Sequence, residues 1–208
     1  LEVTCDDSEI VRVTGDRIII AVGTVPYRPA YIPFDDAIVD ADEILKIHRL
    51  PRSLTVIGAS VIGIEYATIF SALDVKVTVI DPNDSLLSFV DRELVDEFVH
   101  DLRDRGLSLR FQSKVQSVTR AGNSCVIALE DRRQITAEMV LFAAGRKGAT
   151  EQLNLAACGL MADERGRIAV DKGTFRTAVS HIYAVGDVVG FPSLASTSME
   201  QGRIAACH

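Results

Sequence analysis

The chain has 208 residues, of which 48% are hydrophobic and 25% are charged, and its formal net charge is −7. These proportions are typical of a globular protein with one or two domains. The excess of acids argues against a nucleic-acid partner, because clusters of basic residues bind phosphate groups. No apolar run approaches the roughly 18 residues of a membrane span and no signal peptide is recognisable, so we expect a cytoplasmic protein without a membrane partner.

The cysteines lie far apart, at Cys5, Cys125, Cys158 and Cys207. Their spacing matches neither a metal site nor a redox pair, and the four histidines show no ligand spacing either. We therefore expect isolated reduced cysteines and no bound metal.

The first predicted elements are a short strand or turn at 11–15 and a fully buried strand at 17–24, which is a nearly continuous apolar run. Pro26 and Pro29 then interrupt regular structure. A connector with one short helix, at 40–48, leads to the next strand.

Residues 53–81 follow the pattern strand, glycine turn, helix, strand, acid, which is typical of a dinucleotide-binding unit. Gly58 permits the tight turn, and Gly63 lets the helix pack closely on the strand. The start of the helix offers free N–H groups to a pyrophosphate, and Asp81 is placed to accept hydrogen bonds from a ribose. The alternative is an ordinary glycine-containing turn from a strand into a helix.

Ser60 stands where the middle glycine of this motif is expected. Its Cβ would either crowd the pyrophosphate or bring a hydroxyl group that donates to it. The sequence leaves both possibilities open.

Beyond Asp81, the sequence predicts an amphipathic helix at 91–105 that stops at Gly106. The remaining predicted strands are 108–111, 115–119, 125–130, 135–144, 167–170 and 181–185. A hairpin signature lies between the second and third of these strands. A helix rich in small residues begins near residue 194.

Three apolar strands end in a small residue followed by glycine, at 19–24, 141–146 and 182–187. Together with the 58–63 turn, this order resembles the flavoprotein pyridine-nucleotide disulfide oxidoreductases over essentially the whole chain. The resemblance implies an α/β fold in which a doubly wound, Rossmann-like NAD(P)-binding domain with a three-stranded antiparallel β-meander is inserted between parts of an FAD-binding domain. The implied segments are 1–35 (first FAD segment), 36–150 (NAD(P)-binding domain) and 151–208 (second FAD segment).

The resemblance also implies cofactor-binding residues. For NAD(P) these are Gly58, Ser60, Val61, Ile62, Gly63, Glu65, Asp81, Val115, Gly145 and Arg146, and for FAD they are Gly23, Gly186 and Asp187. Glu65 would lie near the nicotinamide, Val115 would touch the adenine, and Asp187 would bind the ribityl chain. The simpler alternatives are a helix-dipole acid, a packing residue and a turn acid, respectively.

Within the family, segments 61–70, 186–196 and 201–206 most resemble the transhydrogenase branch. The implied reaction is hydride transfer from NADPH through FAD to NAD⁺. The alternatives are a flavin disulfide reductase similar to dihydrolipoamide dehydrogenase, a non-catalytic NAD-binding module, and a fold without a nucleotide.

Asp81 favours the free 2′-hydroxyl of NAD(H) over the 2′-phosphate of NADP(H). No Arg or Lys occurs from residue 81 to 90 to pair with that phosphate. We therefore expect NADP(H) to bind more weakly, or to be held by Arg52, Arg92 or Arg146.

The chain begins inside a strand-like pattern and stops inside a helical one, so we expect an excised piece of a longer, homo-oligomeric enzyme. The piece would contain no catalytic residue, would be inactive and would bind FAD poorly. Strands 18–22 and 182–185 would expose apolar surface, and copies of the piece would associate.

Overall fold

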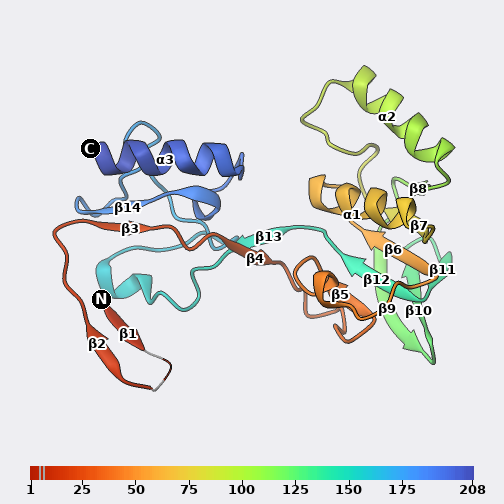
Figure 1. Cartoon of the computed structure of the whole chain (residues 1–208), viewed down its shortest axis with the longest axis horizontal. Coiled ribbons are helices and arrows are strands. Elements are labelled where there is room, and N and C mark those ends of the chain that lie inside the picture. The colour runs from red at the N-terminus through yellow and green to blue at the C-terminus, as the bar shows by residue number, and fades with distance from the viewer. Residues whose placement is uncertain (5, 7) are drawn as a thin grey trace. The chain divides into compact units, whose positions relative to one another are not determined.

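The structure is a computed structural model that describes residues 1–4, 6 and 8–208, so Cys5 lies outside the described residues. The chain divides into two compact units (Figure 1). One unit is continuous and comprises residues 26–145, whereas the other combines residues 1–25 with residues 146–208. The boundaries predicted at 35/36 and 150/151 lie further along the chain than these contact boundaries.

A five-stranded parallel sheet forms the centre of the 26–145 unit. Its strand order is β5 (Ile38–Asp40), β12 (Met139–Phe142), β6 (Ser53–Ile57), β7 (Lys76–Ile80) and β8 (Ser108–Arg110). Most strand residues are buried, which is why these segments are almost continuously apolar in the sequence. The predicted α/β fold with a parallel sheet is confirmed.

Two helices connect β6, β7 and β8 and pack on one face of this sheet. They are α1 (Val61–Ala72), between β6 and β7, and α2 (Arg92–Asp104), between β7 and β8. Alternate strand residues such as Leu54 and Val56 point to this face and join the helices in one core cluster. Asp91 caps α2 by accepting a hydrogen bond from the Glu93 amide at 2.9 Å.

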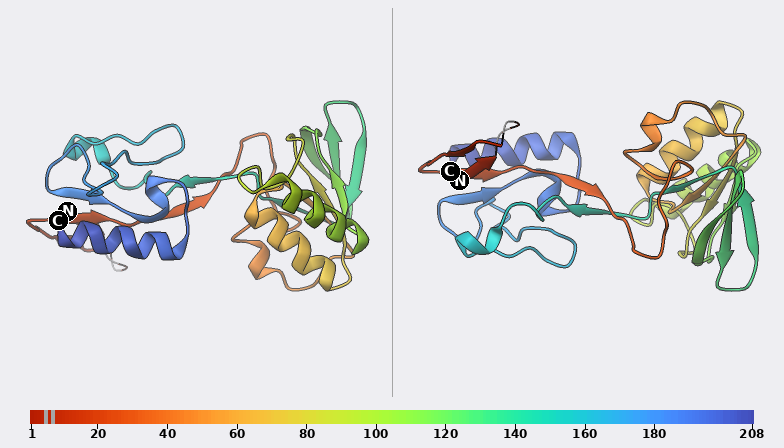
Figure 2. Two further views of the ribbon diagram at one scale, coloured as in Figure 1. Left: turned by 90° about the horizontal axis from the view of Figure 1, so that it is seen from above. Right: turned by 90° about the horizontal axis from the view of Figure 1, so that it is seen from below.

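The opposite face of the parallel sheet is covered by strands instead of helices. β9 (Val115–Ala121), β10 (Ser124–Leu129) and β11 (Gln134–Ala137) form a three-stranded antiparallel sheet. Ile57, Val140 and Phe142 share a second core cluster with Ile127 and Leu129 of this sheet. Figures 1 and 2 show the two helices and the antiparallel strands on opposite sides of the parallel sheet. A doubly wound arrangement has helices on both faces, so that part of the prediction is corrected for this unit.

The strand predicted at 135–144 is two strands, because the chain changes sheets at Glu138. Its amide donates to Ser53 Oγ at 3.0 Å, and its carboxylate accepts from the Arg52 amide at 2.7 Å. β11 therefore ends in the antiparallel sheet, and β12 begins in the parallel one. The helix predicted at 40–48 is likewise wrong, since that region contains the end of β5 and a 3₁₀ turn, η1 (Ile44–Lys46).

The second unit consists mainly of short elements. They are β1 (Glu2–Thr4), β2 (Ile10–Arg12), β3 (Ile18–Ile20), β4 (Thr24–Pro26), β13 (Arg146–Gly148), η2 (Leu155–Cys158), β14 (Ile182–Ala184), η3 (Gly186–Val189) and α3 (Ala195–Cys207). β3 and β14 run parallel, and their side chains form a small core with Leu155, Leu160 and Ile168. The strand predicted at 167–170 is reduced to one isolated bridge, from Ala162 to Ile168.

The burial predicted for the two strands of this unit is partly wrong. Ile19 is 44% exposed and Val22 is 40% exposed, so the predicted strand 17–24 is not fully buried. Residues 182–185, by contrast, are all buried, because cores on both sides of β14 enclose them. Nowhere in the described part of the chain is a helix both long and apolar enough to cross a membrane.

Candidate functional site

The glycine turn after β6 lies at the carboxyl edge of the parallel sheet, between the ends of β7 and β12. Gly58 has φ +109°, and a Cβ atom on it would lie 2.8 Å from the Ala143 carbonyl carbon. A Cβ atom on Gly63 would lie 1.9 Å from the Gly58 carbonyl oxygen. Both positions therefore require glycine, Gly58 for its backbone conformation and Gly63 for the close approach of α1 to the turn.

Ser60 occupies the middle position of the turn without strain, because its φ of −74° and ψ of 176° are ordinary extended values. Its hydroxyl donates to the Ala143 carbonyl oxygen at 3.3 Å, which ties the turn to the end of β12. Ser60 makes no side-chain cap on α1. The N-terminus of the helix thus keeps the uncapped N–H groups and the partial positive charge that bind an anion.

Asp81 ends β7 and turns its carboxylate into the loop beside it. The residue is only 6% exposed. Its Oδ2 accepts a hydrogen bond from the Ala59 amide at 2.6 Å, and its Oδ1 accepts one from the Asn83 amide at 2.8 Å. The structure therefore brings the predicted acid and the predicted glycine turn together, but through a direct hydrogen bond between them.

The other predicted residues of the 26–145 unit lie around this turn or in the core. Val61 is 45% exposed, Glu65 is exposed further along α1, and Gly145 is exposed beyond β12. Ile62 packs against the core on the helix face, and Val115 packs against the core on the face of the antiparallel sheet. Val115 thus makes the packing contacts of its simpler alternative, and its contact with the adenine stays a prediction.

The three basic residues predicted for a 2′-phosphate lie in different parts of the chain. Arg52 precedes β6 and so lies at the amino edge of the sheet, and Arg92 forms an exposed ion pair with Asp96 at 3.8 Å. Arg146 lies in the other unit, where its Nε and Nη2 atoms donate to Oγ1 and O of Thr24, both at 2.8 Å. Because five strand residues at about 3.3 Å each separate the two ends of β6, Arg52 is ruled out as a partner near Asp81.

The fold brings the backbone of Arg110 and Ser113 next to that of Asp81. The Asp81 amide donates to the Arg110 carbonyl, and the Ser113 amide donates to the Asp81 carbonyl, both at 3.0 Å. Sequence reasoning missed them because it searched only the segment that follows Asp81 directly. Their proximity comes from the pairing of β7 with β8.

In the second unit, the predicted FAD residues follow two paired strands. β3 and β14 are parallel neighbours, so Gly23 and Gly186 follow the same edge of the pair. Asp187 is the second residue of η3, which begins at Gly186. Gln201, a buried residue of α3, accepts the Gly186 amide hydrogen bond at 2.7 Å and holds this turn. Sequence analysis did not single out Gln201, because nothing local marks a glutamine whose partner lies fifteen residues away.

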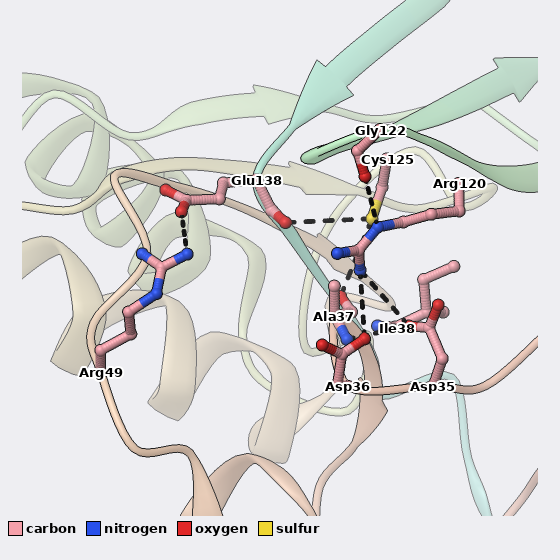
Figure 3. Close-up of polar contacts among 9 residues, drawn as sticks. All are labelled: Asp35, Asp36, Ala37, Ile38, Arg49, Arg120, Gly122, Cys125 and Glu138. Carbon is pink, nitrogen blue, oxygen red and sulfur yellow. Dashed lines mark hydrogen bonds and ion pairs between the residues drawn. The ribbon is translucent and has the colours of Figure 1, made fainter.

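A hollow of about 560 Å³ lies at the amino edge of the parallel sheet, away from the glycine turn. Arg120 faces it with an ion pair to Asp36 at 3.4 Å, and Arg49 pairs with Glu138 at 2.5 Å (Figure 3). Burial raises the pKa of the neighbouring Cys125 thiol, although Arg120 opposes that shift. Cys125 is thus a neutral core residue, and the charges around the hollow largely compensate each other.

Of the described residues, no group of three or more His, Cys, Asp or Glu side chains is placed to hold a metal ion. The described cysteines are all free: Cys125 is buried, and Cys158 and Cys207 are exposed.

A parallel sheet with a glycine turn at its carboxyl edge is typical of nucleotide-binding α/β folds. The chain belongs to the pyridine nucleotide-disulphide oxidoreductase family, whose sequence profile it matches over residues 2–202.

Among its relatives, a soluble pyridine nucleotide transhydrogenase of Mycobacterium bovis is 50% identical over 201 residues, which are 96% of this chain and 43% of that protein. A soluble pyridine nucleotide transhydrogenase of Aliivibrio fischeri is 42% identical and covers 98% of this chain and 43% of its own length. The crystal structure of LpdA from Mycobacterium tuberculosis superposes with a TM-score of 0.92 at 28% identity, over 98% of this chain and 44% of that one. The chain thus spans less than half the length of these relatives.

Proposed function

We propose that this chain is the nucleotide-binding part of a flavoprotein that transfers hydride between NADPH and NAD⁺. The observation that supports this most is the turn from Gly58 to Gly63, which combines two obligatory glycines with an uncapped helix N-terminus at the carboxyl edge of the sheet. Relatives that are 50% and 42% identical carry the name soluble pyridine nucleotide transhydrogenase. Those names favour this reaction over the disulfide reductase and the non-catalytic module.

In this proposal the 26–145 unit is the NAD(P)-binding domain. The amides at the start of α1 receive the pyrophosphate, since an uncapped helix end next to a glycine turn fits an anion. Val61 and Glu65 extend along the exposed side of the same helix, toward the nicotinamide half of the cofactor. The charge of the pyrophosphate is stabilised by the backbone, without any basic side chain from the turn itself.

The other unit, formed by residues 1–25 and 146–208, is proposed as part of an FAD-binding domain that the NAD(P) domain interrupts. Asp187, at the turn that Gln201 holds, would accept hydrogen bonds from flavin hydroxyl groups. FAD supplies the hydride chemistry when bound, and this chain positions the nicotinamide nucleotide. None of the described residues is assigned a catalytic role.

The test is a pair of measurements. Calorimetric titration of the chain with NADH should give one binding site, and the same titration with FAD should give weak binding at most. The complete gene product that contains the chain should be yellow and should reduce a thio-analogue of NAD⁺ with NADPH. Absence of NADH binding to the chain would refute the nucleotide site. A flavin-free gene product, or one that reduces only disulfides, would refute the reaction.

A further inference from the structure

The backbone amide, the backbone carbonyl and both carboxylate oxygens of Asp81 all form hydrogen bonds within the protein. Its carboxylate accepts from the Ala59 and Asn83 amides at 2.6 and 2.8 Å. Its own amide and carbonyl bond to Arg110 and Ser113, each at 3.0 Å. Asp81 thereby joins the glycine turn after β6 to the loops that follow β7 and β8.

These contacts bear on the choice between NADH and NADPH. An acid selects NADH when its oxygens accept from the ribose hydroxyls and its charge repels a 2′-phosphate. Here two amides already occupy the carboxylate, their dipoles oppose its charge, and only 6% of the residue is exposed. Little of the carboxylate remains for direct contact with a ribose.

We propose that Asp81 is a positioning residue that braces the diphosphate-binding turn and does not select between NADH and NADPH. This inference rests on the proposed function and replaces the predicted preference for NAD(H). It accounts for one site that serves two nucleotides, as hydride exchange between NADPH and NAD⁺ requires. Selection against the 2′-phosphate would otherwise obstruct one half of that reaction.

The test compares Asp81→Ala and Asp81→Asn with Asp84→Ala, an exposed acid in the same loop, in the full chain. The dissociation constants of NADH, NADPH, ADP and adenosine are measured by calorimetry. In Asp81→Ala, NADH and NADPH should both weaken by about tenfold or more, because two loop amides lose their acceptor. Their ratio should stay within about threefold of the wild-type ratio, and Asp84→Ala should match the wild type.

The affinities for ADP and adenosine distinguish a local effect of Asp81 on the turn from a general loss of structure. If Asp81 positions the turn, its variants should lose ADP affinity and keep adenosine affinity, because only ADP carries the diphosphate. Asp81→Asn keeps the size of the side chain and one acceptor oxygen, so it should show the same pattern with a smaller loss. A variant in which NADH weakens tenfold while NADPH is unchanged or tightens would overturn the proposal.

Amide hydrogen exchange tests the role of Asp81 without a bound nucleotide, so it can be judged even if the proposed function fails. If the wild-type chain binds neither nucleotide nor ADP, the proposed function fails. The positioning role of Asp81 is then judged by how well the Ala59 and Asn83 amides are protected from hydrogen exchange. Faster exchange of both amides in Asp81→Ala, with the rest of the unit unchanged, would support the positioning role of Asp81. Unchanged protection would overturn it.

Discussion

At the scale of single residues, the approach of α1 to the end of β6 depends on the absence of one side chain. Gly63 is buried, and its Cα faces the Gly58 carbonyl so closely that a Cβ atom would lie 1.9 Å away. Neither backbone segment can move without disturbing the sheet. A methyl group at this position must therefore displace the helix.

We predict that Gly63→Ala lowers the free energy of unfolding by about 3 kcal/mol and weakens NADH binding, because overpacking shifts the helix start. Urea unfolding followed by circular dichroism measures the first effect. Gly202→Ala, in α3, is the matched control, since a Cβ atom there meets nothing within 4 Å. The control should change stability by about 1 kcal/mol or less. Equal stabilities of the two variants would show that the close approach is not rigid.

At the scale of elements, the junction between β11 and β12 determines how the two sheets of the 26–145 unit are joined. Glu138 stands at the junction and binds the segment that enters β6. The hydrogen bond from the Arg52 amide, together with Arg49, lowers the pKa of the Glu138 carboxyl group. The charged form of this side chain therefore favours the folded state.

We predict that Glu138→Gln lowers the thermal midpoint at pH 7. A carboxyl group whose pKa is lower in the folded state stabilises the fold above its unfolded pKa, about 4.3 for Glu, and loses that contribution as the pH falls. The difference between the variant and the wild type should therefore shrink in acid, toward pH 3. Scanning calorimetry between pH 3 and pH 8 measures it, with the exposed Glu97→Gln in α2 as the control. A difference that is constant with pH would contradict the charge-dependent role.

At the scale of the whole molecule, the two units differ in how well they bury their apolar residues. The 26–145 unit has a core on each face of its parallel sheet. The other unit leaves β3 with one described strand partner and exposes Ile19 and Val22. Exposed apolar strands favour contact between copies.

We predict that the chain self-associates through β3 and the segment that follows it, and that the double variant Ile19→Ser, Val22→Ser reduces this association. Sedimentation velocity over a range of concentrations measures the change. Met161→Ser, at a loop position that is 85% exposed, is the control for loss of an exposed apolar side chain outside the strand. A monomeric wild-type chain, or equal effects of the two changes, would contradict the prediction.

The local elements of the 26–145 unit were predictable because their signals lie within a few residues of each other. Asp91 and Gly106 mark the ends of α2, and the helix begins and ends beside them. Gly58 and Gly63 mark the turn after β6 for steric reasons that concern one strand and one helix. The class of fold and the position of the candidate nucleotide site follow from the same patterns.

Contacts between distant segments were not predictable from those patterns. An apolar run such as 135–144 does not reveal that its two halves belong to different sheets, because that depends on the partners of Glu138. Gln201 acquires its role only when α3 packs beside the Gly186 turn.

The sequence by itself determined the parallel α/β unit, its glycine turn and the acid at the end of β7, because backbone sterics and apolar periodicity act over short stretches of chain. Only the tertiary structure decided where the Asp81 carboxylate points and that the Asp81 backbone bonds to Arg110 and Ser113. The direction of a buried carboxylate is set by the amides that surround it. In this protein those amides come from Ala59 and Asn83, on two different loops that only strand pairing brings together.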